Sequence, residues 1–139
     1  MPELRVDALM SKKPRTVYAD ETADLAELLM ALGSIRHLPV VDREGALVGI
    51  VSKRDVLRAG ERQSRPNEPR LFEHSSMAVR DIMSPDLLTV APETTALEGA
   101  LLMRKNQIGC LPVVSDNRLV GIVTESDYVE LAASLLQRG

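Results

Sequence analysis

Two short segments of the chain place a hydroxyl three residues before a carboxylate. The first runs from Ser52 to Asp55 and the second from Thr124 to Asp127. Each follows a strand-like apolar run and precedes a helical pattern, so each hydroxyl is predicted at a strand-to-helix turn. Free N–H groups and the positive end of the helix dipole favour an anion there. The structural alternative is a capping box with Asp in place of Glu or Gln.

Motifs typical of enzymes are not found in the sequence. There is no Gly-x-Ser-x-Gly elbow, Walker A loop or His-Glu-x-x-His helix, and the single Cys and two His form no catalytic pair or metal-ligand cluster. We therefore expect a binding protein that is not an enzyme and has no metal site. Cys110 has no partner for an internal disulfide, which indicates a reducing compartment, and is predicted to be a small buried residue.

The composition of the 139 residues excludes further classes of function. The net charge of −3 offers no general attraction for nucleic acid or anionic membranes, and only 2% of residues are aromatic. No signal peptide or membrane-spanning stretch is found at either end or within the chain. Because neither is found, we expect a cytoplasmic protein. Its 45% of hydrophobic residues are enough to form a core.

The chain consists of two copies of one unit. About twenty of about fifty aligned positions are identical, with copy two starting 73 residues after copy one. The matching segments are Val6–Ser11 with Val79–Ser84, Leu38–Val41 with Leu111–Val114, and Leu47–Ser52 with Leu119–Thr124. A shared fold for the two copies follows.

The first helix of each copy is predicted from its apolar spacing. In copy one this apolar face comprises Leu25, Leu28, Leu29 and Leu32. Asp20 or Thr22 can cap its start. We expect it to end at Gly33, matched by Asn106 in copy two, because Gly and Asn readily adopt the left-handed conformation that closes a helix.

The remaining elements complete a β-α-β-β-α order in each copy. Strands are predicted at Leu38–Val41 and Leu47–Ser52, joined by a turn in which Gly45 supplies a positive φ. A second helix begins near Ser52, and its counterpart near Thr124. We expect an α+β fold with repeat 1 at residues 1–60, a linker at 61–77 and repeat 2 at 78–139. Since one such repeat buries too little surface alone, the repeats should pack sheet to sheet with pseudo-two-fold symmetry.

These features resemble the CBS domain family, whose paired repeats are called a Bateman module. Three motifs carry the resemblance in both copies: Met-Ser followed by Thr-Val, then Leu-Pro-Val-Val, then Val-Gly-Ile-Val-[Ser/Thr]-x-x-Asp. Together they cover nearly the whole chain. The resemblance implies a non-catalytic module with up to two adenosine-type clefts between the sheets.

The resemblance also implies which residues bind. Adenine would lie between the Thr-Val segment and the residues before Leu-Pro, the Asp would hold the ribose hydroxyls, and the Ser or Thr would contact phosphate. The residues carried over to one cleft are Thr16, Val17, His37, Leu38, Pro39, Ser52 and Asp55. Those of the other are Thr89, Val90, Cys110, Leu111, Pro112, Thr124 and Asp127.

The two sites are predicted to differ in charge. Copy one surrounds its motif with the basic residues Arg36, His37, Lys53 and Arg54. Copy two has Gly109, Cys110, Glu125 and Ser126 instead. The first site should therefore prefer charged nucleotides, while the second is vacant or takes a less anionic adenosine ligand. Two alternatives stay open: Lys53 and Arg54 form an ordinary solvated helical turn, and Arg36 and His37 point toward the neighbouring cleft.

These considerations predict an adenine-nucleotide-binding regulatory or sensor module that acts in trans on a separate protein. The expected ligand is AMP, ADP or ATP, with S-adenosylmethionine as a further candidate, and no cofactor is required. A homodimer is expected, with no nucleic-acid or membrane partner. The alternative is a structural dimerisation or docking module whose clefts remain empty.

Overall fold

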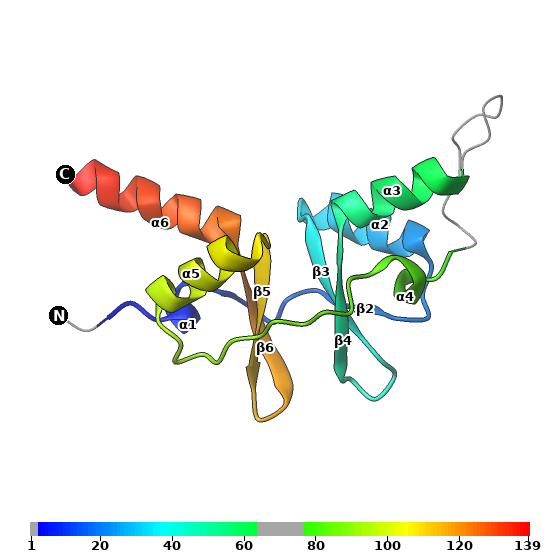
Figure 1. Ribbon diagram of the computed structural model, residues 1–139, viewed down its shortest axis with the longest axis horizontal. Coiled ribbons are helices and arrows are strands. Elements are labelled where there is room, and N and C mark those ends of the chain that lie inside the picture. Colours follow the sequence, from blue (N-terminus) through cyan, green and yellow to red (C-terminus); the bar gives the residue numbers. More distant parts are fainter. Residues whose placement is uncertain (1–2, 64–76) are drawn as a thin grey trace. The chain divides into compact units, whose positions relative to one another are not determined.

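The chain forms two compact units, each built on a three-stranded sheet. The computed structural model describes residues 3–63 and 77–139 (Figure 1). Unit 1 contains residues 1–14 and 88–139, and unit 2 contains residues 15–87. Each unit therefore holds most of one sequence repeat together with the opening segment of the other.

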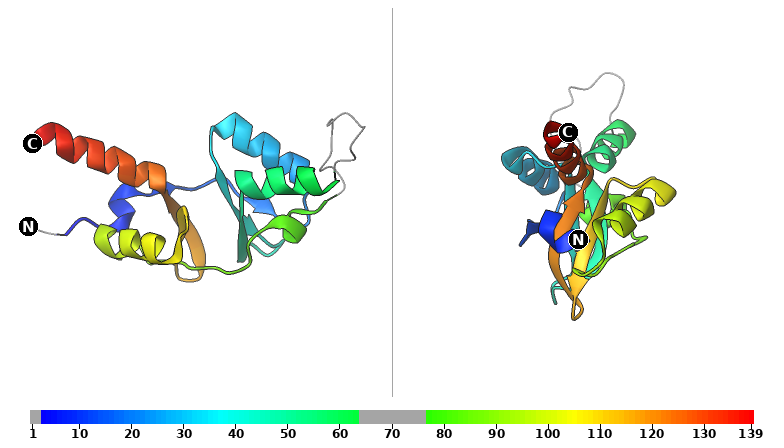
Figure 2. Two further views of the ribbon diagram at one scale, coloured as in Figure 1. Left: turned by 45° about the horizontal axis from the view of Figure 1, so that its top comes forward. Right: turned by 90° about the vertical axis from the view of Figure 1, so that its left-hand side faces the viewer.

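Unit 2 contains most of copy one. Its elements are β2 (Val17–Tyr18), α2 (Ala23–Gly33), β3 (His37–Val41), β4 (Leu47–Ser52), α3 (Lys53–Gln63) and α4 (Val79–Ile82). The strand order is β2-β3-β4, with β2 parallel and β4 antiparallel to β3. Helices α2 and α3 pack against each other (Figure 2). The predicted β-α-β-β-α order of this copy is confirmed.

Unit 1 repeats this plan with copy two. Its elements are α1 (Val6–Leu9), β1 (Ser11–Lys12), α5 (Ala96–Asn106), β5 (Cys110–Ser115), β6 (Arg118–Thr124) and α6 (Glu125–Arg138). The strand order is β1-β6-β5, and all pairs are antiparallel. Val90 forms a single parallel bridge to Val113, at the position that β2 occupies in unit 2. The mixed α and β composition predicted for both copies is therefore confirmed.

The opening segments of the two repeats are exchanged between the units. Val6 is fully buried in unit 1, and Val79 is fully buried in unit 2. Backbone bonds fix both segments: Val6 N–H donates to Thr94 O at 2.7 Å, and Val79 N–H donates to Glu21 O at 2.8 Å. Each repeat thus completes the core of the unit that contains the other.

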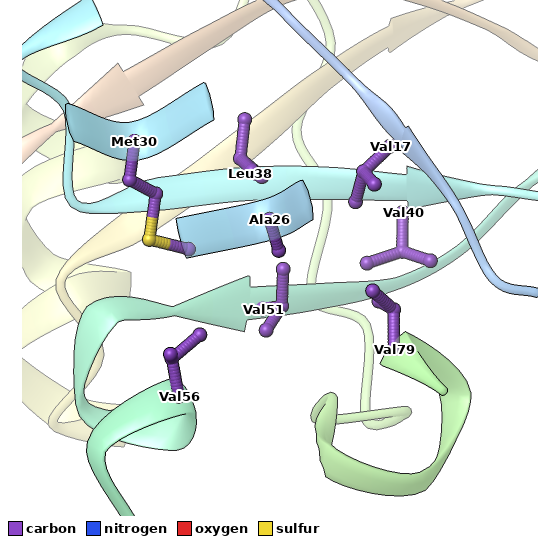
Figure 3. Packing of buried hydrophobic residues seen from close by; sticks show 8 residues of the cluster. All are labelled: Val17, Ala26, Met30, Leu38, Val40, Val51, Val56 and Val79. Carbon is purple, nitrogen blue, oxygen red and sulfur yellow. The ribbon is translucent and has the colours of Figure 1, made fainter. Parts of the chain in front are cut away.

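The two cores use equivalent residues. Figure 3 shows the core of unit 2, where side chains from β3, β4, α2 and α3 converge. Its buried residues are Val17, Ala26, Met30, Leu38, Val40, Val51, Val56 and Val79. The unit 1 core consists of Val6, Val90, Met103, Leu111, Val113 and Val123. Both cores are aliphatic, as the near absence of aromatic residues predicts.

The ends of α2 and α5 correct one prediction. Both helices end at the predicted residues, Gly33 and Asn106, but the left-handed residue is the next one, Ser34 at φ 51° and Gln107 at φ 53°. The N–H of Ile35 donates to Met30 O at 3.0 Å, which makes a Schellman closure whose left-handed residue lies just past the helix. Partly buried Ile35 then packs on the core, and this contact sets where the helix ends.

The start of α2 and the following turn agree with the sequence. Thr22, rather than Asp20, is the cap and accepts from Leu25 N–H at 3.4 Å. Asp20 instead pairs with Arg43 at 2.8 Å. Gly45 has φ 87°, as the turn between β3 and β4 requires.

Helix α2 has two apolar faces, and only one of them is packed on the sheet. The residues it buries are Ala23, Ala26 and Met30. Of the predicted apolar face, Leu25 and Leu29 are partly buried, whereas Leu28 and Leu32 are 53% and 67% exposed. The expected face is therefore only half covered within unit 2.

The predicted linker lies mostly outside the described residues. Helix α3 continues to Gln63, and the description resumes at Met77, whose carbonyl accepts from Ala23 N–H at 2.9 Å. Among the helices of residues 3–63 and 77–139, none is long and apolar enough to cross a membrane.

Candidate functional site

The Ser52–Asp55 segment forms a complete capping box at the start of α3. Ser52 N–H donates to Asp55 Oδ2 at 2.8 Å, and Asp55 N–H donates to Ser52 Oγ at 3.1 Å. Both side chains are half-buried. The structural alternative considered from the sequence is thus present in the molecule.

The Thr124–Asp127 segment has the same arrangement at the start of α6. Thr124 N–H donates to Asp127 Oδ2 at 2.8 Å, and the Thr124 side chain accepts from the Asp127 backbone N–H. In both boxes the cap uses Oδ2, while Oδ1 of Asp55 and Asp127 accepts no hydrogen bond from the described residues. Capping therefore leaves one carboxylate oxygen available, so a cap and a ligand contact are compatible.

Strand pairing brings the hydroxyls next to the residues that precede Leu-Pro. Ser52 is the register partner of His37, and Thr124 is the register partner of Cys110. The turn is closed by Lys53 N–H, which donates to Arg36 O at 2.9 Å. The residues before Leu-Pro and the hydroxyl-to-Asp segment thus meet at one end of the sheet in each copy.

The remaining predicted residues differ in what they can offer a ligand. Thr16 and Thr89 are exposed, each beside the strand that carries Leu-Pro. The core takes up the side chains of Val17, Leu38, Val90 and Leu111. Pro39 and Pro112 are fully buried. For this buried group, contact with a ligand is restricted to backbone atoms.

A cavity of about 370 Å³ lies beside α2 and α3 in unit 2. The residues that line it are Glu27, Met30, Ala31, Ser34, Ile35, Arg36, Lys53, Val56 and Leu57. Arg36 and Lys53 are the only residues of the predicted site among them, since Ser52 and Asp55 are not part of the lining. The sequence did not predict this cavity, because it depends on how α2 and α3 pack together.

The corresponding surroundings in copy two are less polar and more acidic. Glu125 N–H donates to Gly109 O at 3.1 Å, so the backbone closure matches that of copy one. Burial, assisted by the charge of Glu125, raises the pKa of the Cys110 thiol to about 12. Copy two therefore offers a neutral thiol and an acid where copy one offers His37 and Lys53.

Tyr128 fixes the start of α6 beside the second box. Its hydroxyl donates to Ala96 O at 2.7 Å and lies against Gly99, where a Cβ would stand 2.5 Å away. Burial and the neighbouring Asp127 raise the pKa of this phenol. The equivalent residue of copy one is Val56, which has no such bond.

Curated relatives match nearly the whole length of this chain. A CBS domain-containing protein from Dictyostelium discoideum is 38% identical over 135 residues, which cover 95% of this chain and 93% of the relative. An inosine-5′-monophosphate dehydrogenase from Methanocaldococcus jannaschii is 34% identical over 127 residues, which cover 91% of this chain. The chain spans only 23% of that dehydrogenase.

Solved structures with this fold include a CBS domain pair and a further protein, CBSX2, both in complex with adenosine compounds. One was crystallised with 5′-methylthioadenosine and S-adenosyl-L-methionine; it has a TM-score of 0.82 and 29% identity, and the match covers 96% of this chain and 98% of that chain. Another, CBSX2, was crystallised with AMP and has a TM-score of 0.77 and 27% identity, covering 95% of this chain and 98% of that one. The CBS domain family model matches residues 6–62 and 79–134. The chain therefore belongs to the CBS domain family and carries two tandem repeats of that domain.

Proposed function

We propose that this protein is a non-catalytic module that binds an adenine nucleotide and regulates another protein in trans. The observation that carries the proposal is the pair of equivalent capping boxes at the two strand-to-helix turns, each with a carboxylate oxygen that accepts no hydrogen bond from residues 3–63 and 77–139. The adenosine compounds bound to two structurally similar proteins, a CBS domain pair and CBSX2, support the choice of ligand class. The location we propose is the cytoplasm.

In the first site, we assign the ligand contacts by chemistry. The unused oxygen of Asp55 accepts from a ribose hydroxyl, and the Ser52 hydroxyl contacts phosphate at the start of α3. The basic residues Arg36, His37, Lys53 and Arg54 favour a charged nucleotide, AMP, ADP or ATP. Backbone atoms of Val17, Leu38 and Pro39, together with Thr16, border the base.

In the second site, the same scheme applies to Asp127 and Thr124. Its neighbours Cys110 and Glu125 supply no positive charge, so this site suits a ligand with little negative charge, such as S-adenosylmethionine, or remains empty. The base of this ligand is bordered by the residues equivalent to those of copy one, which are Thr89 and the backbone of Val90, Leu111 and Pro112.

The first-site assignment is tested by calorimetric titration of AMP, ADP, ATP and S-adenosylmethionine into the intact protein and Asp55→Asn. Asparagine keeps a side-chain oxygen for the Ser52 N–H, so the helix cap survives, but the charge that strengthens the sugar contact is lost. We expect nucleotide affinity to fall about 10- to 100-fold with little change in Tm. Asp24→Asn, an acid in the first turn of α2, is the matched control and should bind like the wild type.

Two results would count against the assignment. Unchanged affinity in both Asp55→Asn and Asp55→Ala would mean that the acid acts only as a cap. Equal loss in Asp55→Asn and Asp24→Asn would mean that net charge, not a local contact, controls binding.

The alternative function is a dimerisation or docking module without a ligand. A thermal-shift screen separates the two, because a ligand at 100 times its Kd adds about 2.7 kcal/mol to the free energy of unfolding. No shift with any adenosine compound would favour the docking module. In either case we propose that the protein is a homodimer, since apolar side chains on α2, α3, α5 and α6 are exposed.

A further inference from the structure

The cavity of about 370 Å³ in unit 2 is lined by one face of α2 and one face of α3. On α3 the lining residues are Lys53, Val56 and Leu57, at positions i, i+3 and i+4. On α2 they are Glu27, Met30 and Ala31, with the same spacing. At about 30 Å³ for each water-sized group, the cavity holds on the order of a dozen non-hydrogen atoms. A small organic molecule therefore fits within unit 2 alone.

The inner wall of the cavity is apolar. Met30 and Val56, both labelled in Figure 3, are core residues that are 4% and 1% exposed. Ile35 is partly buried against the same core. The side chains of Ala31 and Leu57 are exposed and add apolar surface nearer the solvent. Such a lining favours a hydrocarbon chain or ring over a polyphosphate.

Two basic residues lie at one end of this apolar lining. Lys53 N–H donates to Arg36 O at 2.9 Å, so the backbone holds both residues together beside the cavity. Their side chains are exposed, and neither makes an ion pair within residues 3–63 and 77–139. Glu27 is the acid among the lining residues, so the formal charges of the lining sum to +1. The cavity thus suits a ligand with one negative group and an apolar body.

The equivalent residues of copy two differ in charge and in size. Gly109 stands in place of Arg36, and Glu125 in place of Lys53. Tyr128 stands in place of Val56, and its hydroxyl reaches α5, where it donates to Ala96 O. Copy two therefore has an acid and a bulky ring where copy one has basic residues and a small valine. The features that suit an anionic ligand are specific to copy one.

We infer that the cavity beside α2 and α3 binds a small amphipathic carboxylate, of which a medium-chain fatty acid is the simplest example. The hydrocarbon chain packs against Met30, Ile35 and Val56, and the carboxylate pairs with Arg36 and Lys53. This site goes beyond the proposed nucleotide site, since Ser52 and Asp55 do not line the cavity. Arg36 and Lys53 are assigned to both sites, so the test is made without nucleotide.

Calorimetric titration of sodium octanoate into the full chain tests the inference. We expect saturable binding with one site per chain. Octan-1-ol keeps the hydrocarbon chain and lacks the charge, whereas acetate keeps the charge and lacks the chain. Each should bind at least about 10-fold more weakly than octanoate, because each loses one of the two interactions.

Two variants locate the site. Lys53→Glu introduces the residue of copy two and should weaken octanoate binding about 10- to 100-fold. Arg58→Glu is the matched control, because it makes the same change of charge on α3 outside the cavity lining, and should bind like the wild type. Ala31→Leu fills part of the cavity without changing its charge and should weaken binding at least about 10-fold. Ala31 is exposed and leucine suits a helix, so this variant should fold with little change in Tm.

Four results would overturn the inference. The first is an absence of saturable octanoate binding to the wild type, and the second is equal affinity for octanoate and octan-1-ol. Equal losses in Lys53→Glu and Arg58→Glu would mean that net charge controls binding. Undiminished affinity in Ala31→Leu would mean that octanoate binds outside the cavity. None of these results bears on nucleotide binding, which the Asp55→Asn titration tests separately.

Discussion

At the scale of single residues, one side chain often serves both the fold and the predicted ligand site. Asp55 and Asp127 each cap a helix start with Oδ2, while their Oδ1 accepts no hydrogen bond from the part of the chain that the structure describes. A capping role and a binding role therefore cannot be separated by removing the side chain. Only a substitution that keeps the cap and changes the charge separates them.

Cys110 gives a residue-scale prediction about pH. Burial raises the pKa of the folded thiol to about 12, whereas the thiol of the unfolded chain has its ordinary pKa of 9.0. Between these values the unfolded state binds fewer protons, so unfolding becomes easier as pH rises. We expect the stability of the wild type relative to Cys110→Ala to fall by about 1.4 kcal/mol per pH unit above pH 9, measured by urea unfolding. Parallel pH profiles for the two proteins would contradict this.

At the scale of elements, caps and turns are determined by neighbouring residues, whereas helix ends and the burial of helix faces are determined by long-range packing. Gly45 was predicted correctly, Thr22 was one of the two predicted caps, and the capping box of Ser52 and Asp55 was the structural alternative to a ligand role. These features could be predicted because caps and turns depend on a few neighbouring residues. The left-handed residue at the end of α2 was predicted one position early, since it is set by the packing of Ile35 on the core. The exposed half of the α2 apolar face could not be predicted either. Apolar periodicity shows which residues share a helix face, but not whether that face is buried.

The candidate site likewise combines contacts that the sequence predicts with features that depend on long-range packing. The juxtaposition of His37 with Ser52 follows from strand register, which the repeated motifs and the turn largely determine. The cavity beside α2 and α3 depends on how two helices pack, and no short motif encodes that. Burial of Leu38 and Val17 was likewise hidden, because apolar residues suit a ligand pocket and a core equally well.

Tyr128 gives an element-scale prediction. Tyr128→Phe removes the hydrogen bond to Ala96 O that joins α6 to α5, and should lower the free energy of unfolding by about 0.5–1.5 kcal/mol. Tyr18→Phe is the matched control, because Tyr18 is exposed and meets Arg43 through its ring, 4.0 Å from the guanidinium carbon. Equal urea midpoints for the two variants would argue against a stabilising role for the Tyr128 bond.

At the scale of the whole molecule, the exchanged opening segments tie the two repeats together. Gly121 allows the close approach of Met10 and Ser11, and Gly49 allows that of Met83 and Ser84. A Cβ at Gly121 would stand 3.0 Å from Ser11 O, and one at Gly49 would stand 2.9 Å from Ser84 O. The exchange therefore depends on glycine at equivalent positions of both sheets.

This arrangement predicts that a substitution acts on the opposite repeat. Val6→Ala removes buried apolar volume from unit 1, and should cost about 1–3 kcal/mol while speeding amide exchange in residues 88–139. Val79→Ala should do the same for residues 15–63. Hydrogen exchange followed by mass spectrometry locates the effect. Faster exchange confined to the repeat that carries the substitution would contradict the exchange of segments.

The buried positions of Val6 and Val79 also constrain how such a protein can be taken apart or shortened. A cut at the sequence boundary between the repeats yields two fragments, each lacking a core valine that the other retains. Each fragment therefore lacks part of the core of its own unit, so we expect either repeat expressed alone to be less stable than the intact chain.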